Sequence, residues 1–414
     1  MPSRPIVLHI TGDYPDPSRA PTTVAIKGLI DSLTGCDHVV VSLSRTPDPR
    51  CLKVVEFPAP AGQRLFAIHY FGLPFGVGLL PSFFGVARQI ERLLDTYGLR
   101  PNMVHSHRLT FDGLAGWLIA RWRGIGHVVS VRGEVESKVL RHKPTYRPLI
   151  RRILADAHRI YYVSAWIRPE LERLAPNISA KSRDLPNIVA NTRPNIEPGT
   201  AGDTFVAAAN LDIYEKKGLD RLISAFAQAA PSIPQARLDI IGTGKPENVA
   251  RLQALIDTTG YKDRIRLRGP LPNAAFLAEL PAALALALPS HNETFGLVYT
   301  EALFAGVPIL YSRGTGIDGH LTGLDVGIAV NPDDTDAIAD SLIELYRRND
   351  QFRLAISAAA PELFARFDPD RQVALYMADV AAALAGHHHD GVVPASPEPT
   401  HDTQAHRARA AGAK

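Results

Sequence analysis

The sequence predicts an α/β protein made of two domains, each with a mainly parallel sheet. Three observations support this fold class. The 414 residues are too many for one ordinary core, so two domains are expected. Short apolar runs of strand length alternate with segments of helical spacing, which is typical of parallel sheets. Hydrophobic residues make up 46% of the chain and its mean hydropathy is −0.03, which indicates a globular protein.

Charge is divided unevenly along the chain. The formal net charge is +3, but residues 1–190 hold 25 Lys/Arg against 15 Asp/Glu, which leaves the remainder near −7. A basic half and an acidic half suggest different partners. Cys36 and Cys51 lack metal-type spacing, and the first apolar run is too short for a signal peptide. We therefore expect a cytoplasmic protein without a spanning helix.

The first half begins as a strand–helix–strand unit and continues in the same way. The expected elements are strands at 6–10, 38–43, 103–105, 128–131 and 160–164, and a helix at 22–33. Ligands of open α/β sheets bind at the carboxyl ends of the strands, so the loop 11–23 is a candidate wall of a site. It could equally be a plain connection.

Residues 65–87 contain no Asp, Glu, Lys or Arg. Their number approaches the roughly 20 residues of a membrane span, but Pro74, Pro81 and the glycines of this segment make a spanning helix improbable. Two interpretations remain. One is a loop-rich cover over the core, which we favour; the other is an apolar surface that meets a lipid or an acceptor.

Polar residues follow the next two strands of this half. His105 and His107 could suggest a metal, but no third ligand accompanies them locally, so we expect no metal. Arg132-Gly133-Glu134 ends the strand at 128–131.

A basic tract follows at 138–159. Its cations are Lys138, Arg141, Lys143, Arg147, Arg151, Arg152 and Arg159. They form either a solvated helix face or a surface attracted to anionic lipid or an anionic acceptor, where each cation adds about 1 kcal/mol. Nucleic acid is not expected as a partner, because aromatic residues are sparse there and no known binding module is present.

A linker rich in Pro, Asn and Thr is expected at 185–204. The expected elements after it are strands at 205–209, 238–241 and 265–269, and helices at 219–229, 331–346 and 368–385. Gly242-Thr243-Gly244-Lys245 is not a P-loop, because that motif needs Ser or Thr after the lysine and Pro246 stands there. Two Asp-x-Asp matches, at 334–336 and 368–370, stand at expected helix starts and are interpreted as caps.

Residues 282–311 form the central stretch of the second half. They predict a strand at 284–288, a polar loop at 291–293, a short helix from about 295 to 306 and a strand at 307–311. Glu293 precedes the helix and Glu301 lies within it. Gly296 would let a ligand approach the backbone amides at the positive helix end. Such a unit could hold a phosphate between two acids that bind hydroxyl groups.

Several motifs together resemble the retaining nucleotide-sugar glycosyltransferases of the GT-B fold, known as glycosyltransferase family 4 or group 1. The second-half motifs are KKGLDRLISAF at 216–226, LDIIGTGKPE at 238–247, IRLRGPL at 265–271 and PSHNETFGLVYTEALFAGVPIL at 289–310. The first half is similar more loosely, through HSH at 105–107, SVRGE at 130–134, YYVS at 161–164 and LPNIV at 185–189. The resemblance covers about residues 5–385 and is strongest at 205–350.

The resemblance implies two Rossmann-like domains that face a central cleft. The implied division is an acceptor-binding domain at 1–195, a donor domain at 196–366, a helix at 367–385 that could cross back to the N-terminal domain, and a disordered tail at 386–414.

It also implies roles for individual residues. Lys217 would contact the donor diphosphate, and Glu293 and Glu301 would bind the sugar and the ribose hydroxyls. Gly296, Leu297 and Val298 would offer amides, and residues near Leu271 would lie by the base. No cofactor or metal is required, since Lys217 and the helix end would replace it.

This sequence departs from its relatives at three places. Thr22 and Thr23 stand near the expected glycine-rich loop and could supply a hydroxyl and amides instead. Asn210 stands where an arginine is usual, with Lys216 as a possible substitute. Arg132 replaces a frequent histidine and cannot act as a base, so it could stabilise phosphate or hold an anionic acceptor. His107 is the alternative polar group in that wall, and the base stays unassigned.

The expected function is retaining, hexosyltransferase-type transfer from a nucleoside-diphosphate sugar to a glycan or lipid-linked acceptor. Exopolysaccharide or lipopolysaccharide synthesis fits this reading, with possible peripheral contact to an anionic membrane. The alternatives are a non-catalytic nucleotide-sugar-binding protein of the same fold, or another sugar-nucleotide enzyme of epimerase or phosphorylase type. The sequence leaves open the nucleotide, the sugar, the acceptor and the oligomeric state.

Overall fold

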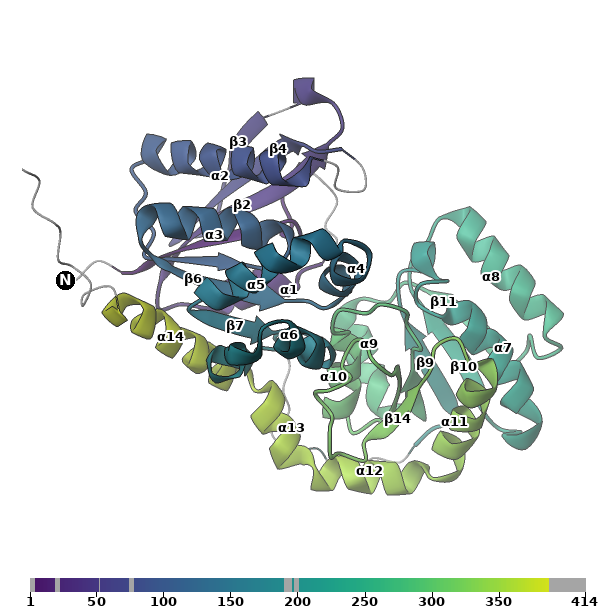
Figure 1. The fold of residues 1–414 in the computed structure, drawn as a ribbon. Helices are drawn as coiled ribbons and strands as arrows, with labels where there is room; N and C mark the ends of the chain where they lie inside the picture. The colour runs from purple at the N-terminus through teal and green to yellow at the C-terminus, as the bar shows by residue number, and fades with distance from the viewer. Residues whose placement is uncertain are drawn as a thin grey trace, which may run out of the picture.

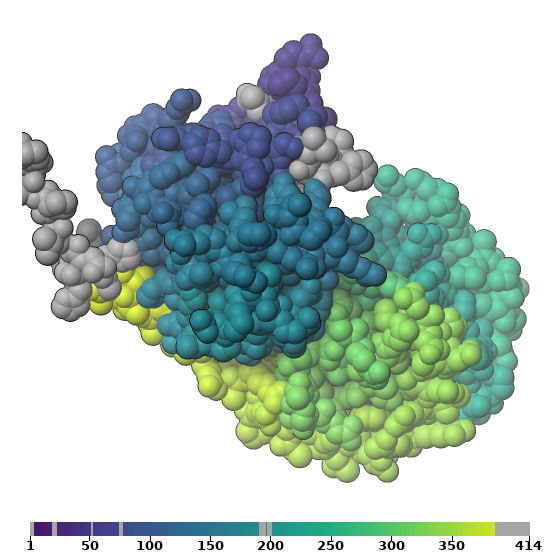
Figure 2. All heavy atoms as spheres, viewed as in Figure 1, coloured from purple at the N-terminus to yellow at the C-terminus, as the bar shows by residue number. Residues whose placement is uncertain are grey.

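The computed structural model describes residues 4–18, 23–51, 53–73, 78–189, 196 and 201–386. Two α/β units, each with its own sheet, lie side by side (Figure 1). In the space-filling view the teal helices of the first unit sit directly against the green part of the second (Figure 2). The predicted α/β class with two parallel-sheet domains is confirmed.

The first sheet has eight strands in the order β3-β4-β2-β1-β5-β6-β7-β8. The strands are β1 Ile6–Thr11, β2 Asp37–Thr46, β3 Lys53–Phe57, β4 Gln63–Phe71, β5 Met103–Ser106, β6 Gly126–Val131, β7 Arg159–Tyr162 and β8 Ser182–Asp184. All neighbours are parallel except β3 and β4, which are antiparallel. The carboxyl ends of the parallel strands therefore meet at one edge, where ligands of such sheets bind.

Helices cover both faces of this sheet. One face carries α2 Leu79–Thr96, α3 Phe111–Arg123, α4 Glu134–His142, α5 Arg147–Asp156 and α6 Arg168–Leu174, and the other carries α1 Ala25–Ser32 and α14 Pro369–Gly386. Adjacent residues of one strand serve the two faces, as period-two geometry requires: Leu8 packs in the first core and Val7 in the second.

The interpretation of residues 65–87 as a loop-rich cover is wrong. This segment contains most of β4 and the start of α2. Charged residues are missing because β4 is buried beside β2, with Phe66, Ala67 and Ile68 fully inaccessible. Residues 74–77, which include Pro74, lie outside the described residues.

The second sheet is parallel throughout, in the order β11-β10-β9-β12-β13-β14. Its strands are β9 Thr204–Ala208, β10 Arg237–Ile241, β11 Ile265–Gly269, β12 Ala285–Ala287, β13 Ile309–Ser312 and β14 Gly327–Val330. Its helices are α7 Leu219–Ala229, α8 Pro246–Thr258, α9 Asn273–Glu279, α10 Leu297–Phe304, α11 Thr335–Arg347, α12 Asn349–Ala358 and α13 Ala360–Phe367.

Two sequence interpretations of this domain can be checked directly. Pro246 begins α8, so the glycine-rich run before it ends in an ordinary helix start. Asp334 caps α11, because its side chain accepts a hydrogen bond of 2.9 Å from the amide of Ala337. Its predicted role as a cap is confirmed.

The last described helix, α14, returns to the first domain. Tyr376, Val380 and Ala383 are buried against Val7 and Met103 of the first sheet. Polar groups also join the helix to the sheet. The hydroxyl of Tyr376 lies 3.0 Å from Nδ1 of His105, and the hydroxyl of Tyr161 donates to Asp379 at 2.8 Å. Residues 387–414, for which a disordered tail was expected, lie outside the described residues.

The buried contact between Tyr376 and His105 gives a stability prediction. Tyr376→Phe removes the hydroxyl and leaves a buried imidazole nitrogen without its partner. An unsatisfied buried polar group costs about 1–3 kcal/mol, so we expect the free energy of unfolding to fall by about that amount. Urea unfolding followed by circular dichroism measures the change. The control is Tyr97→Phe, at an exposed tyrosine; equal stabilities of the two variants would contradict the role of the buried hydrogen bond.

Candidate active site

A cavity of about 480 Å³ lies between the two domains, at the carboxyl ends of strands from both sheets. Its first-domain lining is Asp13, Thr23, Arg108, Arg132 and Glu134. The remaining lining residues are Asn187, Ala208, Lys216, Lys217, Leu288, Glu293, Thr294, Phe295, Gly296, Leu297 and Val298. The cavity has the position that open α/β sheets give to their ligand sites.

The start of α10 forms one wall of this cavity. Gly296 precedes the helix with φ of +78°, and a Cβ at this position would lie 2.4 Å from the ring of Tyr299. Only glycine fits both the backbone conformation and the space. The first amides of α10, from Leu297 and Val298, thus border the cavity at the positive end of the helix dipole.

Lys217 and Glu293 form an ion pair beside these amides. They come from separate loops, which the backbone fastens together: the amide of His291 donates to the carbonyl of Lys216 at 2.7 Å. Gly218 permits this approach, since a Cβ there would lie 2.2 Å from the carbonyl oxygen of Pro289. Both side chains are mostly buried, with exposed fractions of 18% and 15%. The pair is therefore held in position before any ligand arrives.

The backbone of Glu293 is fixed from the other side as well. Its carbonyl accepts hydrogen bonds from the amide of Gly316 and the hydroxyl of Thr315, each at 2.9 Å.

A second lysine joins the two domains. Lys216 donates to both carboxylate oxygens of Glu134 at 2.9 Å, and Lys138 donates to one of them at 3.0 Å. Burial alone would raise the pKa of Glu134, but the hydrogen bonds from the two lysines outweigh it and lower this pKa. Glu134 therefore stays ionised at neutral pH and bridges the cleft from the first domain.

The first-domain wall contains two arginines. Arg132 is buried, and its Nε donates to the carbonyl of His107 at 3.1 Å. Burial lowers the pKa of Arg132 to about 10, so the side chain remains cationic at neutral pH. Arg108 pairs with Asp13. Behind them, burial raises the pKa of Asp112 to about 7, with Arg108 acting in the opposite direction.

The charges that line the cavity leave a net positive site. Four cations, Arg108, Arg132, Lys216 and Lys217, face three carboxylates, Asp13, Glu134 and Glu293. Fixed cations and helix amides of this kind stabilise negative charge that develops on a leaving group in a water-poor site. The arrangement suits a ligand with a diphosphate.

The structure brings some of the predicted site residues together and not others. Thr23, Arg132, Lys217, Glu293, Gly296, Leu297 and Val298 line the same cavity. Glu301 and Leu271 do not line it; Glu301 lies farther along α10, where burial raises its pKa, and Leu271 packs against the second core. Thr22 lies outside the described residues.

Sequence reasoning missed several residues of the cavity. Asp13 stands in the loop already named as a candidate wall, so its place at a strand end was a usable signal. Glu134 had been noted only as part of the strand end. Its contact with Lys216 joins positions 82 residues apart, and no local pattern indicates such a pair. Asn210, noted as a departure, accepts from the amide of Asp212 at 2.8 Å and serves as a helix cap.

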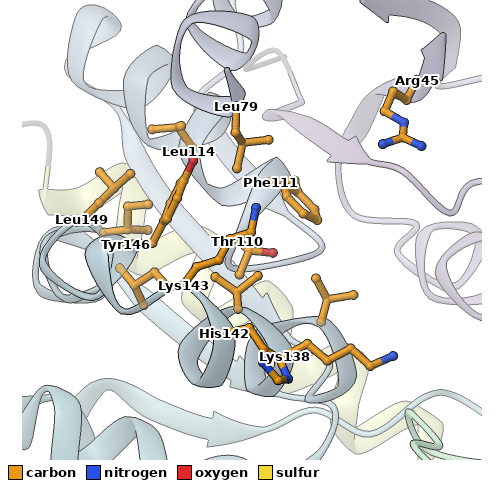
Figure 3. A pocket seen from close by; sticks show the side chains of 14 residues that line it. Arg45, Leu79, Thr110, Phe111, Leu114, Lys138, His142, Lys143, Tyr146 and Leu149 are labelled. Atoms are coloured by element: carbon orange, nitrogen blue, oxygen red, sulfur yellow. The ribbon is translucent and has the colours of Figure 1, made fainter. Parts of the chain in front are cut away.

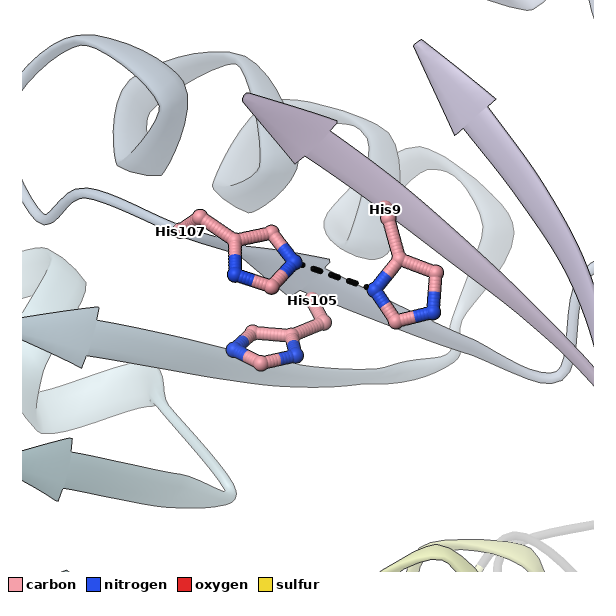
Figure 4. Close-up of side chains that lie close together, drawn as sticks. All are labelled: His9, His105 and His107. Carbon is pink, nitrogen blue, oxygen red and sulfur yellow. Dashed lines mark hydrogen bonds between the residues drawn. The ribbon is translucent and has the colours of Figure 1, made fainter. Parts of the chain in front are cut away.

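His107 does not reach the cavity with its side chain. Its ring is fully buried, and Nε2 lies 3.1 Å from Nδ1 of His9 (Figure 4). His9 in turn bonds His38 at 3.0 Å, and His105 bonds the hydroxyl of Ser130 at 2.8 Å. Only the carbonyl of His107 contacts Arg132.

His9 is also the third histidine that was absent from the local sequence. Nitrogen atoms of His9, His105 and His107 lie within 4.8 Å of one another, which is close enough for one metal ion. Both ring nitrogens of His9 and of His105 already bond neighbouring rings or hydroxyls, so a metal would have to displace these hydrogen bonds. Nδ1 of His107, by contrast, is buried without a partner. The expectation of a metal-independent protein stays a prediction.

Comparison with known families identifies the chain. The family model described as "Glycosyl transferases group 1" matches residues 200–362, and that described as "Glycosyl transferase 4-like domain" matches residues 22–180. The chain belongs to the group 1 glycosyltransferases. This group 1 glycosyltransferase has the GT-B fold, with two parallel-sheet α/β domains on either side of the cavity described above.

Two curated relatives show the range of similar proteins. The chain is 28% identical over 307 residues to a D-inositol 3-phosphate glycosyltransferase of Xylanimonas cellulosilytica, an alignment that covers 68% of this chain and 72% of that protein. It is 28% identical over 236 residues to a GDP-mannose-dependent monoacylated alpha-(1-6)-phosphatidylinositol monomannoside mannosyltransferase of Corynebacterium glutamicum. That alignment covers 52% of this chain and 60% of the relative.

Solved structures confirm the fold. A sucrose-phosphate synthase from Thermosynechococcus elongatus superposes with a TM-score of 0.68 at 19% identity, over 92% of this chain and all of that chain. An Anabaena protein in complex with UDP superposes with a TM-score of 0.64 at 15% identity, over 91% of this chain and 100% of that one. At these identities the similarity establishes the architecture alone.

Proposed function

We propose that this glycosyltransferase moves a sugar from a nucleoside-diphosphate donor to a glycan or lipid-linked acceptor, with retention at the anomeric carbon. One observation carries the proposal: the fixed pair Lys217–Glu293 lies beside the first amides of α10 in a positively charged cavity between the domains. Retention, the hexosyl nature of the sugar and the acceptor are parts of the proposal.

In the proposed reaction the diphosphate leaves as the anomeric bond breaks. Lys217 and the amides of Leu297 and Val298 stabilise the charge that grows on it. Glu293, released from Lys217 by the donor, accepts hydrogen bonds from the sugar hydroxyls. The acceptor proton passes to the leaving phosphate oxygen, which gains negative charge as the anomeric bond breaks. Arg132 stays protonated and does not serve as a base. Arg132 and Arg108 then hold the acceptor or the phosphate.

The names of two relatives support an anionic acceptor, and one of the two names supports a lipid-linked acceptor. The names of the two curated relatives contain an inositol phosphate and an acylated phosphatidylinositol mannoside, respectively. Both named compounds carry phosphate, which suits a wall that contains two arginines. We extend this to exopolysaccharide or lipopolysaccharide synthesis in the cytoplasm, with peripheral contact to an anionic membrane. Among the described helices, none has the length and apolarity needed to cross a bilayer.

Nucleotide binding tests the donor site directly. We expect the diphosphate of the true donor nucleotide to raise the melting temperature of the full chain. At a hundredfold excess over Kd the stabilisation is about 2.7 kcal/mol. Thermal shifts with UDP, GDP and ADP, each with and without EDTA, identify the nucleotide. A shift that EDTA abolishes would contradict metal-independent binding, and no shift with any of the three would remove the donor-site assignment.

A further inference from the structure

A second cavity, in the first domain, has a different chemical character. It has a volume of about 470 Å³ and lies among β2, α2, α3, α4 and α5 (Figure 3). Nine of its 14 lining residues are aliphatic or aromatic, and none is acidic. The volume is within the roughly 300–1,000 Å³ of small-molecule sites.

Cations stand at the margin of this apolar space. Arg45, Lys138 and Lys143 belong to the lining, and in Figure 3 Lys138 extends away from the apolar side chains. An apolar interior with a basic margin is complementary to an amphiphile, that is, to a hydrocarbon chain with an anionic head. A neutral apolar ligand or an acidic peptide would satisfy only one of the two features.

The cavity adjoins the interdomain site through one residue. Lys138 lines it and also donates to Glu134, which lines the interdomain cavity and binds Lys216. A chain seated in this cavity would thus place its head group beside the first-domain wall of the cleft, at the place where the proposed acceptor must react.

We propose that this cavity binds the hydrocarbon chain of a lipid-linked phosphate acceptor, with the phosphate near Lys138 and Lys143. The inference rests on the proposed function and names the acceptor class of that enzyme. Burial of the chain supplies affinity without sequence-specific contacts, since each buried methylene contributes about 0.8 kcal/mol. The cations then select the phosphate-bearing end and set the direction in which the chain enters.

Alkyl phosphates test the cavity without any sugar transfer. Hexyl, octyl, decyl and dodecyl phosphate are titrated below their micellar concentrations into the full chain by isothermal titration calorimetry. We expect saturable one-to-one binding that tightens about fourfold per added methylene, the fold-change that 0.8 kcal/mol represents, until the cavity is full. Inorganic phosphate carries the head group without the chain, and neutral dodecyl maltoside carries the chain without a phosphate. Each should bind at least tenfold more weakly than dodecyl phosphate.

Two filling variants locate the site. Val135→Trp and Leu149→Trp place an indole in the cavity from half-buried positions, and each should weaken dodecyl phosphate at least tenfold. Leu354→Trp, at an exposed leucine of the second domain, is the matched control and should leave binding unchanged. Lys143→Ala should weaken binding about fivefold, the change that corresponds to about 1 kcal/mol per cation.

The outcomes separate this inference from the proposed function. Equal binding of dodecyl phosphate to the wild type and to both filling variants would overturn the cavity assignment, as would the absence of saturable binding. The thermal shift with the donor nucleotide, measured on the same variants, reports whether each is folded and whether the donor site is intact. Absence of nucleotide binding by the wild type would instead refute the proposed function and leave the alkyl phosphate result standing.

Discussion

Replacement of Lys217 by alanine is expected to slow sugar transfer by about 10²–10³-fold, the usual cost of removing one fixed group that stabilises developing charge. Lys217 is held at the cavity by Glu293 and by the bond between His291 and Lys216. Because the charge on the diphosphate grows as the anomeric bond breaks, the lysine stabilises the transition state more than the bound donor. The loss should therefore appear mainly in kcat, in initial rates of nucleotide release that depends on an acceptor.

Two further variants show whether the pair acts as described. Glu293→Gln keeps the shape but loses the negative charge, and in combination with Lys217→Ala it should cost less than the sum of the two single effects. Lys262→Ala, at an exposed lysine of the same domain, is the control. Transfer at the wild-type rate by Lys217→Ala would place the reaction elsewhere.

Mild acid is expected to destabilise the protein steeply. His9, His105, His107 and His127 are buried, and burial lowers the pKa of each, to about 3 for His105 and His127. Unfolded histidine has a pKa near 6.5, so below that pH these histidines bind protons in the unfolded chain but stay neutral in the folded chain. Stability from neutral burial is complete above pH 6.5 and is lost as the pH falls towards 3.

Each such histidine contributes about 1.4 kcal/mol per pH unit below its unfolded pKa, and four contribute about 5 kcal/mol per unit. This is a large part of the roughly 5–15 kcal/mol that separates folded from unfolded proteins. The buried carboxyls of Asp112, Glu136 and Glu301 act in the opposite direction, because burial raises their pKa values, and they offset part of this loss. Urea unfolding at pH 7.5, 6.5 and 5.5 measures the loss. His107→Gln should reduce the slope of unfolding free energy against pH by the contribution of one histidine. His142→Gln, at an exposed histidine, should leave this slope unchanged. Equal pH slopes for the wild type and His107→Gln would contradict neutral burial of His107.

The helices and strands of the second domain could largely be predicted from the sequence, because the patterns that indicate them are local. Gly218 and the helical spacing after it mark α7, the apolar run before Pro289 marks β12, and Asp334 caps α11 as expected. Each of these features depends on neighbours within a few residues. To predict that Lys217 and Glu293 lie together also required the rule that the carboxyl ends of the strands of a parallel sheet share one edge.

The failures concern contacts across long distances in sequence. The uncharged run at 65–87 gives no helical or strand period by itself; burial between β2 and the α2 layer decides its structure. His9 joins His107 across 98 residues, and Lys216 joins Glu134 across 82. Such pairs depend on the strand order β2-β1-β5-β6 and on how the domains face each other, and neither can be read from one chain.

The return of α14 to the first sheet has a consequence for synthesis of the protein. The 18 residues of this helix cover part of the face that contains Val7, Met103 and Tyr161, yet they leave the ribosome only after the entire second domain. Domains generally fold in the order in which they are made. Here the earlier domain must wait for the later one, with apolar side chains and the polar groups of His105 and Tyr161 uncovered in the meantime.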